Sequence, residues 1–306
     1  PPRSTLFPYT TLFRSNQHDK KLQTGMKKIR ICAVLLALAF LSSVLSGQKW
    51  ETLEDYKGVK NVTRGSGIET PVTFVVIYDN YVSKQGTVAD WGFSVLIKGL
   101  DKEILFDTGT KPEIFESNLK SIGIDPSGID MLVLSHEHGD HTGGIPAFVK
   151  MKTGIPVLIP VSFPAGFKKQ MAGLNLTPVM VDAPSMICKH LYTSGEFKYQ
   201  IPEEALVIDT KKGLAVITGC AHPGIINMLT KIKDDFGKDI YLVCGGFHLM
   251  DRTEKELSQI ISEMRKLGVV KCGATHCTGD MQIKMFRETF GENYFELGTG
   301  NEVIII

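Results

Sequence analysis

Residues 135–144 form the most chemically capable run in the 306-residue chain, Ser-His-Glu-His-Gly-Asp-His-Thr-Gly-Gly. Three of the chain's eight histidines and one aspartate fall within six positions. Imidazole and carboxylate groups are ligands that suit zinc or iron. We therefore expect His136 and His138 to bind one metal ion, and Asp140 and His141 to bind a second ion nearby. Glu137 is expected to face solvent.

The segments around this loop predict how it is held. The apolar run 131–134 predicts a buried strand that ends at the loop, and the glycine pair 143–144 leads into a predicted helix at 144–150. Such a strand–loop–helix unit can direct several side chains to one point. Apolar residues at helical spacing predict further helices at 112–122, 162–173, 225–236, 254–267 and 281–290.

Buried strands account for the other apolar runs. They are predicted at 72–78, 93–97, 104–106, 157–159, 240–244, 269–274 and 303–306, and runs at 179–181, 186–191, 205–209 and 214–218 are assigned to a second sheet. Strands followed by helices, twice over, predict an α/β fold with two sheets face to face and helices outside, the αββα four-layer sandwich. Each site residue follows a predicted strand end, where loops from both halves can meet.

The pattern His-x-His-x-Asp-His at 136–141 resembles the metal-binding motif of the metallo-β-lactamase superfamily. Leu-Phe-Asp-Thr-Gly at 105–109 resembles its first motif, which implies that Asp107 supports the metal loop from behind the ligands. A narrower branch contains dihydropterin synthase-like proteins and metal-dependent hydrolases, and three segments are similar to it: 218–224, 245–249 and 275–279. The resemblance covers about residues 70–306 and implies the metallo-β-lactamase fold.

The same resemblance implies the remaining ligands. His276 is similar to the superfamily's final histidine. Cys220 stands at a strand end where many members carry a bridging aspartate, and thiolate is a good zinc ligand. His222 follows two residues later; it is the preferred ligand, and Cys220 stays an alternative or additional one. His248 is similar in position to the catalytic, non-ligand histidine of tRNA-processing relatives, which implies a proton donor.

Together these residues predict metal-dependent hydrolysis. Two divalent ions, Zn²⁺ or alternatively Fe or Mn, would lower the pKa of a bridging water from about 16 to near 7. The resulting hydroxide would attack an ester, lactone, thioester or phosphodiester, with Asp140 and His248 as catalytic residues. The branch resemblance, which segments 78–80 and 91–94 share, implies that Asn80 and Trp91 line the mouth of this small-molecule site. The substrate does not follow from the fold.

Other functions stay open. The branch resemblance implies a transferase that couples a phosphorylated aminobenzene-ribosyl compound to a dihydropterin diphosphate, in methanopterin-type cofactor synthesis. A di-iron redox protein would need electron delivery, and the sequence has no glycine-rich flavin loop. The intact motif at 136–141 disfavours a non-catalytic binding protein. The lack of an earlier ligand histidine disfavours β-lactam hydrolysis.

The first 70 residues show three patterns. Residues 1–25 contain a near-repeat and precede Met26, so they are interpreted as a non-native segment. Residues 26–47 combine a short basic stretch, an apolar run and small residues, the layout of a signal peptide. This predicts an exported protein, periplasmic or extracellular, although an uncleaved anchor helix is the alternative. Residues 48–70 are interpreted as a linker or arm, and 71–306 as the catalytic domain.

Charge and cysteines limit the classes of partner. Residues 1–47 hold seven Lys/Arg and one acid, which leaves 27 basic and 32 acidic residues in the rest of the chain. That balance argues against non-specific nucleic-acid binding.

No stable membrane partner is expected after signal cleavage, and the sequence does not predict the oligomeric state. Five cysteines follow Cys32, an odd number that does not suggest a disulfide framework; three are expected in the core, namely Cys188, Cys244 and Cys272.

Overall fold

The computed structural model describes residues 50–53 and 67–305. The predicted non-native segment 1–25 and the predicted signal peptide 26–47 lie outside the described residues. Within the predicted arm at 48–70, Glu51–Thr52 forms a short strand, β1, that pairs with β7 (Thr177–Val181). Among the described residues, no helix is long and apolar enough to cross a membrane.

The first sheet has eight strands in the order β1-β7-β6-β5-β4-β3-β2-β14. Its other members are β2 (Thr73–Tyr78), β3 (Ser94–Lys98), β4 (Ile104–Phe106), β5 (Met131–Val133), β6 (Pro156–Pro160) and β14 (Glu302–Ile304). Strands β4 to β7 are mutually parallel. Their carboxyl ends therefore lie along one edge of the sheet.

The second sheet has six strands in the order β13-β12-β11-β10-β9-β8. They are β8 (Ser185–Cys188), β9 (Leu191–Thr193), β10 (Leu206–Thr210), β11 (Gly213–Thr218), β12 (Ile240–Gly246) and β13 (Lys271–Thr275). Strands β11, β12 and β13 are parallel. They too bring their carboxyl ends together.

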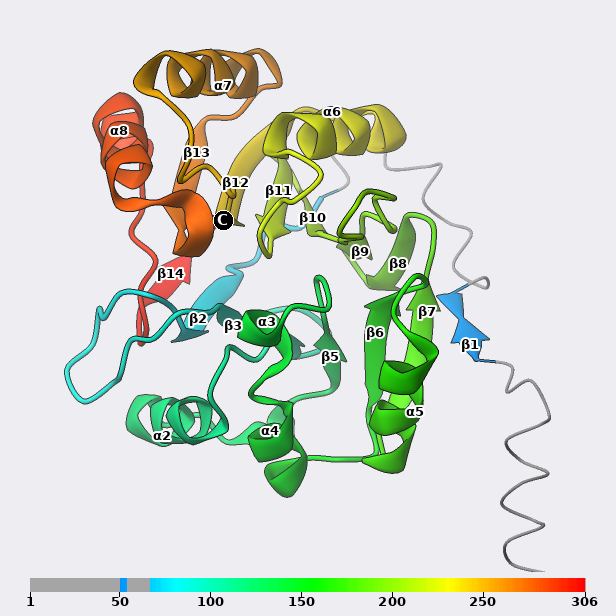
Figure 1. Cartoon of the computed structure of the whole chain (residues 1–306). Helices are drawn as coiled ribbons and strands as arrows, with labels where there is room; N and C mark the ends of the chain where they lie inside the picture. The colour runs from blue at the N-terminus through cyan, green and yellow to red at the C-terminus, as the bar shows by residue number, and fades with distance from the viewer. Residues whose placement is uncertain (1–49, 54–66, 306) are drawn as a thin grey trace, which may run out of the picture. The chain divides into compact units, whose positions relative to one another are not determined.

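Helices cover the outer face of each sheet, so the domain has four layers (Figure 1). The first sheet carries α2 (Pro112–Ile122), α4 (Ile145–Met151) and α5 (Ala165–Gly173), and the second carries α6 (Ile225–Phe236), α7 (Glu254–Lys266) and α8 (Asp280–Phe290). A third cluster of buried side chains, which includes Phe106, Leu206 and Ile217, fills the space between the sheets. Because both faces of each sheet are covered, the strands read as continuous apolar runs. The predicted αββα sandwich is confirmed.

Two strand assignments made from the sequence are wrong. The run 179–181 belongs to β7 of the first sheet, where it pairs in parallel with β6. The run 186–191 is not one strand, because the chain turns at His190, whose φ is 66°, and divides into β8 and β9. Apolar content alone assigns neither a strand's sheet nor a reversal of the chain.

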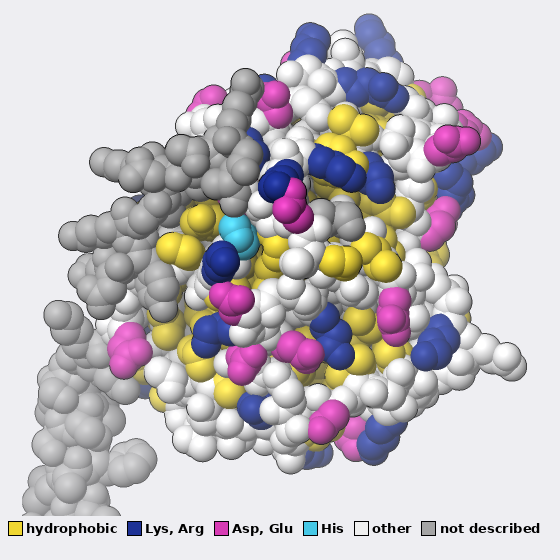
Figure 2. Space-filling view, turned by 180° about the vertical axis from the view of Figure 1, so that it is seen from behind, with side chains coloured by type: hydrophobic (Ala, Val, Ile, Leu, Met, Phe, Trp, Pro, Cys, Tyr) yellow, Lys and Arg dark blue, Asp and Glu magenta, His cyan; other side chains and the backbone are white. Residues whose placement is uncertain are grey.

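Local signals explain where the helices begin and end. Pro112 opens α2, and Gly123 ends it with a φ of 85° that favours glycine. Thr253 and Glu256 form a reciprocal capping box at the start of α7. Phe163 and Met171, beside and within α5, are buried against the first sheet and belong to its core. Figure 2, seen from behind, shows Lys and Arg side chains lying beside Asp and Glu on that face.

Candidate metal centre

The candidate residues come from loops that follow the carboxyl ends of strands in both sheets. The loop after β5 carries His136 and His138 and continues into α3 (Gly139–Thr142), a single turn that carries Asp140 and His141. From the other sheet, the loop after β11 brings Cys220 and His222, and His276 directly follows β13. Residues far apart in sequence thus converge, and they form two donor groups.

The first donor group is three histidines, His136, His138 and His222, whose ligand atoms lie within 4.8 Å of one another. Each pair of rings has its centroids 4.8 Å apart. Burial lowers the pKa of His136 well below its ordinary value and lowers that of His222 to about 3. Neutral imidazole is the form that ligates metal.

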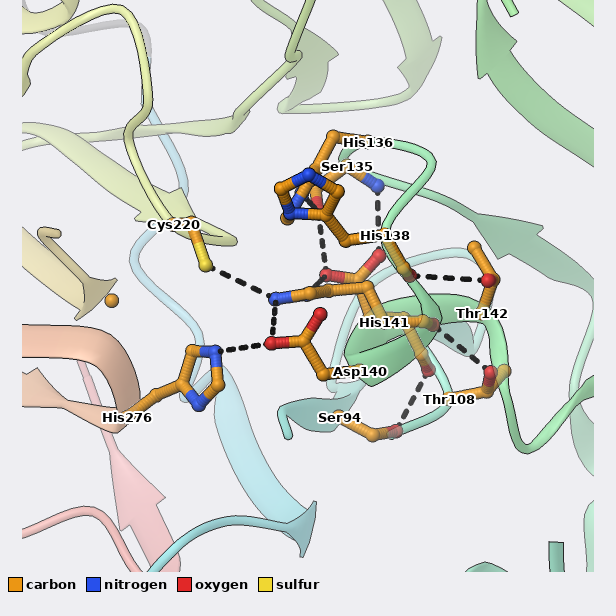
Figure 3. Close-up of polar contacts among 12 residues, drawn as sticks. Ser94, Thr108, Ser135, His136, His138, Asp140, His141, Thr142, Cys220 and His276 are labelled. Atoms are coloured by element: carbon orange, nitrogen blue, oxygen red, sulfur yellow. Dashed lines mark hydrogen bonds and ion pairs between the residues drawn. The ribbon is translucent and has the colours of Figure 1, made fainter. Parts of the chain in front are cut away.

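The second donor group joins Asp140, His141, Cys220 and His276, again within 4.8 Å (Figure 3). His141 Nε2 lies 3.2 Å from Cys220 Sγ and 3.8 Å from Asp140 Oδ2. The same carboxylate oxygen lies 3.3 Å from His276 Nε2. The two groups adjoin, since the ring centroids of His136 and His141 are 4.1 Å apart.

Asp107, directly after β4, orients residues of both groups from behind. Its Oδ1 accepts from the backbone N–H of Ser135 at 2.7 Å, and its Oδ2 accepts from Ser135 Oγ at 2.7 Å and from His141 Nδ1 at 2.6 Å. Because Ser135 Oγ donates to Asp107, it accepts from His136 Nδ1, 2.9 Å away. Both rings therefore present Nε2 to the metal centre. Burial would lower the pKa of His141, but the charge and hydrogen bond of Asp107 raise it to about 9.

Asn80 and Trp91 make hydrogen bonds with two members of the second group, His276 and Asp140 respectively. Asn80 Oδ1 accepts from His276 Nδ1 at 3.0 Å, while Asn80 Nδ2 donates to the His276 carbonyl at 3.2 Å. The Trp91 indole Nε1 donates to Asp140 Oδ2 at 2.8 Å, and its ring centroid is 5.0 Å from that of His276. Partners of this kind fix the orientation of metal ligands. Trp91 remains 45% exposed, so it also faces solvent at the site's mouth.

Glu203 and Ser135 were missed in the sequence. The fully buried Glu203 carboxylate accepts 2.8 Å hydrogen bonds from three successive backbone N–H groups, those of Cys220, Ala221 and His222. It thereby shapes the loop that delivers a donor to each group. Burial raises the pKa of Glu203 to about 7. Glu203 lies in no pattern that indicates its role, because it acts on a segment distant in the chain, whereas the Ser135 hydroxyl contacts both the adjacent His136 and the distant Asp107.

His248, proposed from the sequence as a proton donor, lies at the edge of the first group. Its ring centroid is 4.5 Å from that of His222. A hydrogen bond with Cys277 raises the pKa of His248. The side chain is exposed, in contrast to His136, His141 and His276. It is therefore placed to meet a bound molecule.

Four non-glycine residues at the centre adopt left-handed backbone conformations. The φ angles are 57° for Asp107, 57° for Ala221, 51° for His248 and 51° for His276. Such conformations are uncommon for non-glycine residues and persist where the surrounding structure enforces them. Asp107 and His276 directly follow strands, and His248 and Ala221 lie two and three residues beyond strand ends, where the chain turns sharply to present a side chain.

The donor sets fit divalent cations. Nε2 of His136 and Nε2 of His222 are buried and make no hydrogen bond within the described part of the chain. Unpaired buried polar atoms are costly, and a cation among the three imidazoles would give them partners. The second group offers nitrogen, oxygen and sulfur donors, the set that zinc accepts. Metal ligation by these residues stays a prediction, although the structure brings all the predicted ligands together.

Comparison with known proteins gives the family. A family model described as the metallo-beta-lactamase superfamily matches residues 91–194. A Methanocaldococcus jannaschii protein named 7,8-dihydropterin-6-methyl-4-(beta-D-ribofuranosyl)-aminobenzene-5'-phosphate synthase is 34% identical over 258 residues, covering 68% of this chain and 88% of the relative. The chain belongs to the metallo-beta-lactamase superfamily.

Two further proteins show the extent of this similarity. An uncharacterized protein of the same archaeon is 28% identical over 240 residues, 67% of this chain and 90% of its own. A solved structure described as a metal-dependent hydrolase of the beta-lactamase superfamily superposes with a TM-score of 0.64 at 26% identity. That match covers 76% of this chain and 99% of the other. This metallo-beta-lactamase superfamily member thus shares its fold with proteins named both as a synthase and as a hydrolase.

Proposed function

We propose that this protein is a metal-dependent hydrolase with two divalent cations, Zn²⁺ in the first instance. The observation that supports this most strongly is the pairing of two adjoining donor groups, one of three imidazoles and one that adds a carboxylate and a thiol. When bound, two such cations activate water and polarise the substrate oxygen that is attacked. An ester, lactone, thioester or phosphodiester has an oxygen of the required kind.

The protein's own residues supply orientation and a proton. Asp107, Ser135 and Asn80 fix which ring nitrogen faces the cations in His141, His136 and His276 respectively. Trp91 donates a hydrogen bond to the Asp140 carboxylate. A hydrogen bond with Cys277 raises the pKa of His248 above its ordinary value, which favours the protonated form that can donate a proton. Transfer of that proton to the leaving group would complete the hydrolysis.

A second function is favoured by one comparison. The archaeal relative with 34% identity is named as a synthase of a dihydropterin-ribofuranosylaminobenzene phosphate. In that case the same cations and His248 would activate a dihydropterin diphosphate and a phosphorylated aminobenzene-ribosyl compound. An exported location, which we propose from residues 26–47, would argue against this cofactor chemistry, and amino-terminal sequencing of the secreted protein tests the export.

The test is a turnover assay of the zinc-loaded full chain. The panel would contain p-nitrophenyl acetate, bis(p-nitrophenyl) phosphate, a lactone and a thioester, and separately a dihydropterin diphosphate with a ribofuranosylaminobenzene phosphate. We expect hydrolysis that chelation removes and zinc restores. His136→Ala should abolish it, whereas Glu137→Ala, an exposed neighbour in the same loop, should retain it. Full activity in His136→Ala would refute the metal-dependent scheme, and turnover of the pterin pair alone would favour the synthase.

A further inference from the structure

A pocket of about 480 Å³ opens beside the first donor group, between the first turn of α6 and the exposed side of α7. His222 and His248 both line it, with ring centroids 4.5 Å apart. A molecule bound here would therefore touch a predicted metal ligand and the proposed proton donor at once. The size is that of a small-molecule site.

Arg252 is the one Lys or Arg among the described residues that line the pocket. Arg252 lines it four residues after His248, and its guanidinium is only loosely paired, 3.5 Å from Asp251 and 3.6 Å from Glu256. Glu256 is itself committed to the capping box, where its Oε2 accepts from the backbone N–H and the hydroxyl of Thr253 at 2.8 and 2.7 Å. A guanidinium has five donors, so Arg252 keeps donors for an anionic ligand. The first turn of α6, at the positive end of that helix dipole, lines the same pocket.

The rest of the pocket has a different character. Tyr199, which is 56% exposed, and two isoleucines, Ile226 and Ile260, supply apolar wall. Glu256 and Glu263 stand seven residues apart on the pocket side of α7, so they lie on one helix face. Because Glu256 lies 3.6 Å from Arg252, it is the Glu263 charge that disfavours a second anionic group at a distance from Arg252.

We infer that this pocket binds a substrate with an apolar or aromatic body and a single anionic group next to the bond that is broken. Arg252 binds the anion, Tyr199 and the two isoleucines contact the body, and the reacting centre lies against His222 and His248. This assignment rests on the proposed function, because it takes the donor groups as the reaction centre. It names a substrate class and makes Arg252 the residue that selects it.

The test is calorimetric binding to the zinc-loaded full chain with two non-hydrolysable probes, phenylphosphonate and neutral benzyl alcohol. Arg252→Gln should weaken phenylphosphonate about ten- to a hundredfold, the range for a charge-assisted hydrogen bond, and leave benzyl alcohol unchanged. The fold contact at this position is preserved, because Gln282 binds the backbone carbonyl of Arg252. Lys255→Gln removes the same charge from an exposed position of α7 outside the pocket and should change neither. Tyr199→Ala should weaken both probes.

The outcomes separate this inference from the proposed function. Equal phenylphosphonate affinity in wild type and Arg252→Gln would overturn the inference, as would an equal loss with Lys255→Gln. A loss of both probes in Arg252→Gln would also overturn the assignment of the anion. If no ester is hydrolysed but phenylphosphonate binding still depends on Arg252, the pocket assignment stands and the hydrolase proposal fails.

Discussion

Asp107 Oδ2 accepts a 2.6 Å hydrogen bond from His141 Nδ1, and both side chains are fully buried. The same oxygen accepts from Ser135 Oγ, which in turn accepts from His136 Nδ1. One carboxylate from the first sheet therefore orients a histidine in each donor group. The two predicted metal sites are mechanically linked through this residue.

Replacement of Asp107 by Asn should weaken both metal sites. An amide nitrogen at the position of Oδ2 would face His141 Nδ1 and Ser135 Oγ as a donor, so both rings lose the partner that sets their orientation. Loss of such a partner lowers metal affinity roughly 10- to 100-fold. Competition with a chromophoric chelator measures the two affinities. Asp101→Asn, at an exposed loop position, is the control, and unchanged affinity at both sites in Asp107→Asn would contradict the linkage.

Trp91→Phe should weaken the second site selectively. Phenylalanine keeps a ring near His276 but cannot donate the 2.8 Å hydrogen bond to Asp140 Oδ2. We expect about a tenfold loss in affinity for one ion and no change for the other. The chain has two tryptophans, so metal-induced fluorescence change should persist in Trp50→Phe and vanish in Trp91→Phe. A change that persists in Trp91→Phe with full affinity would show that the indole does not report on this site.

Gly219→Ala should damage the centre through a steric collision. A Cβ at this position would lie 2.1 Å from Ser135 Oγ and 2.7 Å from Ser135 Cβ, where the two halves of the domain meet. We expect destabilisation of about 1–3 kcal/mol together with weaker metal binding. Gly166→Ala, in α5, meets nothing within 4 Å and should leave both unchanged or improve stability slightly. Urea denaturation measures the stability and chelator titration measures the metal affinity. A Gly219→Ala protein with wild-type stability and wild-type metal affinity would refute the close contact.

Glu204→Gln should be more stable than wild type at alkaline pH. Burial raises the pKa of Glu204 to about 8, against 4.5 for an ordinary glutamate. The folded chain thus keeps a proton that the unfolded chain releases, and wild-type stability falls as pH rises from about 4.5 to about 8. Glutamine removes this loss, so the stability difference should grow by at least about 1 kcal/mol over that window. Urea denaturation of metal-free protein at several pH values measures it; Glu137→Gln, at an exposed site, is the control, and a pH-independent difference would contradict the shift.

The sequence predicts those parts of the site that are local. Four donors within 136–141 share one loop, so their convergence needs only the strand before it and the helical turn after it. The strand-end positions of Cys220, His222 and His276 also follow from the apolar runs before them. Contacts between distant segments do not: Glu203 acts on the loop at 220–222 through backbone N–H groups, which any sequence offers.

The sequence does not predict which sheet a strand joins, for the same reason. Strand β7 is as apolar as its neighbours in sequence, and only its parallel pairing with β6 assigns it to the first sheet. Strand β14 likewise returns to the first sheet beside β2, although the elements before it cover the second. The turn at His190 depends on a left-handed backbone conformation, which a histidine in the sequence does not predict.

The most direct test of the two unlike donor groups is cobalt substitution of the full chain, with metal content and absorption measured for wild type, Cys220→Ser and His222→Ala. We expect two ions per chain in wild type, with a thiolate-to-cobalt charge-transfer band. Cys220→Ser should lose that band, and His222→Ala should keep it while losing one ion, because His222 belongs to the other group. A single ion in wild type, or two ions with no thiolate band, would contradict two adjoining metal sites of which one includes Cys220.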